Sequence, residues 1–107
     1  MFFNISEIPY KQKRAGVYIK SVTGEQAHMT FLRLEPGVVT DHSHLHEQMG
    51  YIFSGLVALT IDGETQQLGP GDAYYVPGNV QHGFKVLGEE DLEYVEIFSP
   101  PKEENKP

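Results

Sequence analysis

The chain of 107 residues contains no cysteine. This absence excludes disulfide bonds, a thiolate metal site and a cysteine nucleophile. No stretch of the sequence approaches the ~18 apolar residues that a membrane-spanning helix needs. Residues 1–7 also lack the basic region and apolar region of a secretory signal. The sequence therefore predicts a cytoplasmic protein that does not associate with membranes.

Positive charge is scarce as well, because 8 Lys and Arg residues stand against 15 Asp and Glu, a formal net charge of −7 with the five histidines neutral. Such a chain repels a phosphate backbone, and its basic residues gather only at Lys11, Lys13 and Arg14. Nucleic acid is therefore not expected as a partner. The length predicts one domain over residues 1–107, and the 39% hydrophobic content suffices for a core.

Turn-forming residues punctuate the chain every ~8–12 residues, which is the spacing of an all-β sandwich or barrel. They occur at 23–25, 36–37, 54–55, 62–63, 69–71, 77–79 and 88–90. Segments rich in β-branched and aromatic residues lie between them, at 17–22, 29–34, 51–53, 56–61, 73–76 and 92–98. We expect almost no helix and a type I′ turn at Asp62-Gly63. The barrel core should cover about residues 17–98. A short N-terminal arm should precede it, and a polar C-terminal tail whose end frays should follow it.

Four of the five histidines fall in two places, His42, His44 and His46 in one and His82 in the other. Side chains at i and i+2 of an extended strand share a face, so His42 and His44 can lie side by side. His82 follows a glycine turn, a short apolar strand and a Pro-Gly turn, and in a β-barrel it can reach that pair across the interior. The competing interpretation is two surface histidines on a polar edge strand, but the two elements together favour a metal site.

These two elements resemble the motifs of the cupin family. The first cupin motif is Gly, five residues, His-x-His, three or four residues, Glu, six residues and Gly. In this chain four residues separate Gly37 from His42-Ser43-His44, and then come three residues, Gln48, six residues and Gly55.

The second cupin motif is Gly, five residues, Pro-x-Gly, two residues and His. Gly71, Pro77 and His82 match it, with Asn79 in place of the middle Gly. The resemblance covers roughly residues 31–98. It implies a double-stranded β-helix, the cupin jelly-roll barrel, with a metal at its open end.

The resemblance also implies the metal ligands, which are His42, His44, Gln48 in the Glu position, and His82. They suit one divalent transition metal, with Zn, Mn, Fe, Ni and Cu all open. Because the Gln48 amide is neutral, the ion would keep its full charge and act as a stronger Lewis acid, which disfavours oxidative chemistry. Glu47 is an alternative ligand with less suitable spacing, and His46 is expected at the rim.

Near the C-terminal end of the predicted barrel, Tyr94, Glu96 and Phe98 share one face of a predicted strand. Glu96 either faces the barrel interior, as a candidate general acid or base, or lies on a solvated face. The string from Glu96 to Lys102 is similar to Asp-x-Phe-Ser-Pro-x-Arg of small cupins that ketonise unsaturated uronates from pectin or alginate. That similarity implies catalytic roles for Glu96, Phe98 and Lys102, although Lys cannot form the bidentate contact of Arg.

Three functions remain open at this point. The first is a metal-dependent isomerase that ketonises a small sugar acid, with a small anionic organic molecule as its ligand. The second is a metal-dependent dioxygenase acting on a small organic acid or phenol, and the third is a non-catalytic module that binds a small molecule. We also expect a homodimer, because residues 17–22 would form an apolar edge strand and small cupins are commonly dimers.

Overall fold

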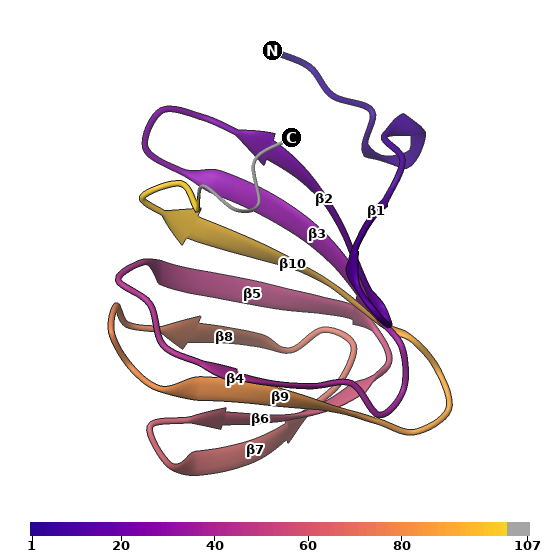
Figure 1. Cartoon of the computed structure of the whole chain (residues 1–107), viewed down its shortest axis with the longest axis vertical. Helices are drawn as coiled ribbons and strands as arrows, with labels where there is room; N and C mark the ends of the chain where they lie inside the picture. Colours follow the sequence, from indigo (N-terminus) through magenta and orange to yellow (C-terminus); the bar gives the residue numbers. More distant parts are fainter. Residues whose placement is uncertain (103–107) are drawn as a thin grey trace.

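The computed structural model describes residues 1–102, and residues 103–107, which hold the tail end expected to fray, lie outside the described residues. Strands form two antiparallel sheets, of order β1-β2-β3-β10-β5-β8 and β4-β9-β6-β7 (Figure 1). Their bounds are β1 Lys11–Arg14, β2 Val17–Thr23, β3 His28–Leu34, β4 Val39–His42, β5 Glu47–Ser54, β6 Leu56–Ile61, β7 Glu64–Leu68, β8 Ala73–Val76, β9 His82–Leu87 and β10 Leu92–Ser99.

The core lies between the two sheets because inward and outward residues alternate along the strands. In β10, for example, Leu92, Tyr94, Glu96 and Phe98 are buried while the residues between them are more exposed. The apolar cluster joins both sheets and contains Val17, Ile19, Leu34, Ile52, Val57, Leu59, Leu68, Phe84, Val86, Leu92 and Tyr94. This architecture confirms the predicted jelly-roll barrel.

Within residues 1–102 the only helical element is the 3₁₀ turn η1, Ile5–Glu7, so almost no helix is found, as expected. None of the helical structure in that part of the chain has the length and hydropathy needed to cross a membrane. The hairpin at Asp62-Gly63 is also confirmed. Both residues have positive φ, 49° and 82°, and Ile61 pairs with Glu64 across the turn.

The expectation that residues 17–22 form an edge strand is wrong. The N-terminal arm supplies β1, which pairs with β2 and covers its edge. Strand β1 has the sequence Lys-Gln-Lys-Arg and all four of its residues are exposed. Composition gave no sign of this strand because it has no apolar alternation, and polar residues on an edge strand are a common protection against aggregation.

Candidate metal centre

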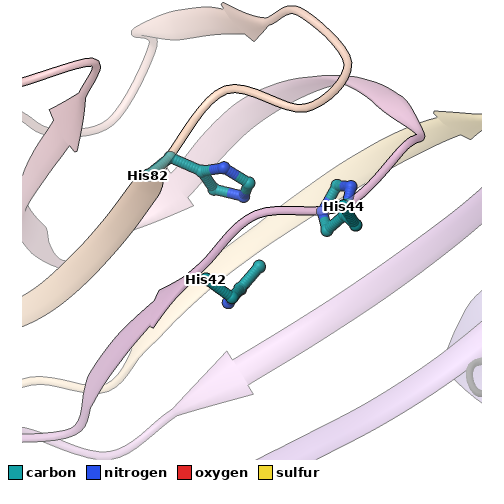
Figure 2. Close-up of side chains that lie close together, drawn as sticks. All are labelled: His42, His44 and His82. Carbon is teal, nitrogen blue, oxygen red and sulfur yellow. The ribbon is translucent and has the colours of Figure 1, made fainter.

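His42, His44 and His82 form a cluster at one end of the barrel (Figure 2). His42 is the last residue of β4 and His82 the first of β9, and the two face each other in the antiparallel register. The ring centroids are 4.5 Å apart for His42 and His82, 5.2 Å for His42 and His44, and 5.0 Å for His44 and His82. One nitrogen from each ring lies within 4.8 Å of the others, which is close enough for all three to bind one ion.

The pairing of His42 with His44 has a different origin from the expected one. Strand β4 ends at His42, so His44 lies in the following loop and not on the same extended strand. The turn before His82 holds that loop, because the Asn79 backbone N–H donates to the His44 carbonyl at 2.7 Å. Asn79 has a φ of 65°, a left-handed conformation that Asn tolerates, which explains why it can stand where the motif has Gly.

Gly78 allows this turn to lie against the His44 loop. A Cβ at position 78 would lie 2.6 Å from the carbonyl oxygen of Leu45. The second motif therefore contributes more than its histidine, because its turn also fixes the backbone beside His44.

Two of the three imidazoles are oriented for metal binding. His44 Nδ1 lies 3.1 Å from the His46 carbonyl and His82 Nδ1 lies 2.9 Å from the Val80 carbonyl. A carbonyl accepts only, so each Nδ1 carries the proton and each Nε2 presents a lone pair. Both Nε2 atoms are buried without a hydrogen-bond partner, an arrangement that a bound cation would satisfy. Burial lowers the pKa of His44, and Lys102 and His82 act in the same direction, so these surroundings favour the neutral ring that a metal ligand needs.

Gln48, the second residue of β5, is buried between β10 and β8. Its Nε2 donates to Glu96 Oε2 at 2.7 Å, while its Oε1 is buried and has no hydrogen-bond partner. An amide oxygen without a partner is a neutral ligand for a divalent ion. A carboxylate at position 48 would place two negative groups against each other, so the departure from the Glu of the cupin motif matches the presence of Glu96.

Glu96 is buried and faces the barrel interior, which decides between the two positions that the sequence left open. Its Oε2 accepts hydrogen bonds from Gln48 and from the Tyr74 hydroxyl. Burial raises the pKa of Glu96 to about 7, against the opposing effects of the Tyr74 hydrogen bond and of the positive charges of Lys102 and Lys13.

The predicted site residues line one cavity of about 330 Å³. This volume falls at the lower end of the ~300–1,000 Å³ of small-molecule sites. Phe98 is buried, packs its ring 5.8 Å from that of His44 and lies 5.1 Å from the Lys102 ammonium group. The lining residues named by the sequence are His42, His44, Gln48, His82, Glu96, Phe98 and Lys102.

Glu47, the alternative ligand, and His46, the expected rim residue, lie outside this group. Glu47 is exposed, and its carboxylate is 3.4 Å from the Tyr75 hydroxyl. His46 packs its ring 6.3 Å from that of Phe98 and is not among the residues that line the cavity.

Sequence reasoning missed Tyr74 as a partner of Glu96 and Lys13 and Arg14 as lining residues. Gly50, in the middle of β5, was the available signal for Tyr74, because an interior glycine in a strand often marks a close approach. The positions of Lys13 and Arg14 depend on a strand that the sequence pattern does not reveal.

Comparisons with known proteins agree with this geometry. The family described as "Cupin domain" matches residues 30–98. A pectin degradation protein, KdgF from Dickeya dadantii, is 31% identical over 104 residues, 94% of each chain. The structure of KdgF from Halomonas sp. superposes with a TM-score of 0.91 at 29% identity, covering 97% of this chain and 98% of that one. An RmlC-like cupin from Shewanella frigidimarina shares the fold, with a TM-score of 0.89 at 22% identity over 96% and 93% of the two chains.

Proposed function

This chain belongs to the cupin family, and on that premise we propose that it is a metal-dependent enzyme that ketonises a small unsaturated sugar acid. The observation that carries the proposal is the position of Gln48. Its amide donates to the buried Glu96, and its oxygen is left without a partner in a cavity that also holds three histidines. This arrangement combines a neutral metal site with a proton-transfer group.

The similarity to a pectin degradation protein supports the substrate class, since pectin is a polymer of uronic acids. Ketonisation of an enol moves a proton from oxygen to carbon and exchanges no electrons with an oxidant. The chemistry therefore needs a group that polarises the substrate oxygens and a group that carries a proton. A divalent ion held by His42, His44, His82 and Gln48 would supply the first as a Lewis acid.

The chain's own side chains supply the rest. Tyr74 and Gln48 both donate to Oε2 of Glu96, so they fix the carboxyl group, and its Oε1 is the oxygen that we assign to proton exchange. Phe98 supports the ring of His44 and lies beneath the ammonium group of Lys102. Lys102 adds positive charge at the cavity wall, where it attracts an acidic substrate.

An ultraviolet assay tests this function. A 4,5-unsaturated uronate loses its absorbance as it ketonises, and the metal-replete protein should accelerate that loss. Glu96→Gln should reduce the acceleration by about 10²-fold or more, the usual contribution of a general acid or base. Glu93→Gln is the matched control. Glu93 lies on the same strand, but its carboxylate accepts a hydrogen bond from the Ser54 hydroxyl and does not line the cavity.

No acceleration by the parent protein refutes the proposal. Oxygen consumption on addition of phenols or keto acids would instead establish the dioxygenase alternative. Binding of a uronate without turnover would establish a non-catalytic module.

A further inference from the structure

Strand β1 contributes two consecutive cations, Lys13 and Arg14, to the lining of the cavity that holds the histidine cluster, and both side chains stay exposed. Consecutive side chains of a regular strand point to opposite faces. Here the register with β2 shifts, because Gln12 pairs with Tyr18 while Arg14 pairs with Val17. Lys13 is therefore the additional residue of a β-bulge, a feature that re-aims side chains. The bulge places Arg14 on the same face as Val17, which is buried and lines the cavity.

The positive charges of these residues act on the inner face of β10. Burial raises the pKa of Tyr94, and the charge of Arg14 opposes that rise. Lys13 opposes the corresponding rise for Glu96. Within residues 1–102, the lining contains three cationic side chains, Lys102 included, against the single carboxylate of Glu96. A chain with a net charge of −7 thus concentrates positive charge at this cavity.

We propose that Arg14 is the principal binding group for the carboxylate of the ligand, with Lys13 adding charge beside it. Arg14 is the only arginine among the described lining residues, and only a guanidinium forms two parallel hydrogen bonds to a carboxylate. Lys102 is a point charge that lies over the ring of Phe98. The ligand is a small monocarboxylate whose other oxygens face the histidine cluster. This choice of ligand class rests on the proposed function.

Calorimetric titration of the full chain, zinc-loaded and metal-free, tests the inference without turnover. Galacturonate is the probe, and galactose is its neutral counterpart. Arg14→Ala should raise the galacturonate Kd by about tenfold or more, as expected for loss of hydrogen bonds to a charged group. Arg14→Lys should also raise that Kd, because it keeps the charge but loses the paired geometry. Galactose binding should not change in either variant.

Lys11→Ala is the matched control, since Lys11 lies on the same strand but does not line the cavity. Its galacturonate Kd should equal that of the parent. An equal loss in Lys11→Ala and Arg14→Ala, an unchanged Kd in Arg14→Ala, or no preference of the parent for galacturonate over galactose would overturn the inference.

The outcome is separable from that of the proposed function. If unsaturated uronates are not ketonised while galacturonate binding depends on Arg14, the inference stands and the function fails. If ketonisation proceeds in Arg14→Ala with an unchanged KM, the function stands and the inference fails.

Discussion

The hydroxyl of Tyr74 reaches the carboxylate of Glu96 across an intervening strand. Tyr74 lies on β8 and Glu96 on β10, and Gly50 of β5 is in register with both. A Cβ at position 50 would lie 2.2 Å from Cζ of Tyr74. The missing side chain of Gly50 is therefore what allows the tyrosine ring to cross β5 and fix the buried acid.

Gly50→Ala should displace that ring and break its hydrogen bond to Glu96. We expect a loss of about 1–3 kcal/mol in the free energy of unfolding, the usual cost of overpacking a core. Urea unfolding measures it. In a Tyr74→Ala background the same substitution should cost much less, because no ring remains to clash. Equal costs in the two backgrounds would contradict this account.

Gln48→Glu should remove the amide donor and set two carboxylates against each other. We expect it to lower the free energy of unfolding by about 1–3 kcal/mol, the cost of leaving a buried polar group unsatisfied. The exchange Gln48→Glu with Glu96→Gln restores one donor and one acceptor. Urea unfolding of the metal-free protein should show that the exchanged variant is more stable than Gln48→Glu alone. If stability does not recover, the hydrogen bond to Glu96 does not explain why position 48 holds an amide.

Metal binding should depend on the three clustered histidines. Elemental analysis of protein expressed with ample metal should find about one divalent transition metal per chain, and His42→Ala with His44→Ala should abolish it. His46→Ala is the matched control and should keep the metal. A ligand at a hundredfold excess over its Kd stabilises the folded state by about 2.7 kcal/mol, so chelation should lower the Tm. A metal-free parent would refute the site.

The homodimer stays a prediction, now with a different candidate surface. Ile97 on the outer face of β10 pairs with Met29 on one side and Met49 on the other, and Met49 pairs with Tyr75. All four side chains are exposed, and an exposed apolar row of this kind is typical of an interface.

Sedimentation should give the dimer mass for the parent and the monomer mass for Ile97→Lys. Gln66→Lys, an equal change of charge on exposed β7 of the other sheet, should remain dimeric. A monomeric parent would end the proposal.

The sequence by itself determined the fold class and named seven of the side chains that line the cavity. Turn residues at regular spacing are local features, so they predicted an all-β sandwich or barrel. Period-2 alternation placed Tyr94, Glu96 and Phe98 on one face of a strand, but it did not decide which face is buried. The resemblance to the cupin motifs implied His42, His44, Gln48 and His82 as a group, and all four line one cavity in the structure.

Only the tertiary structure decided which groups act on those residues. The contact of Tyr74 with Glu96 depends on the order of the strands in the sheet. The position of His44 depends on a turn more than thirty residues away in the chain. The orientation of Arg14 depends on a bulge in a polar strand. Such features have no local periodicity, because they arise from pairings between segments distant in the chain. The motif that predicts metal binding can therefore be read from the sequence, whereas the side chains that surround it are known only from the tertiary structure.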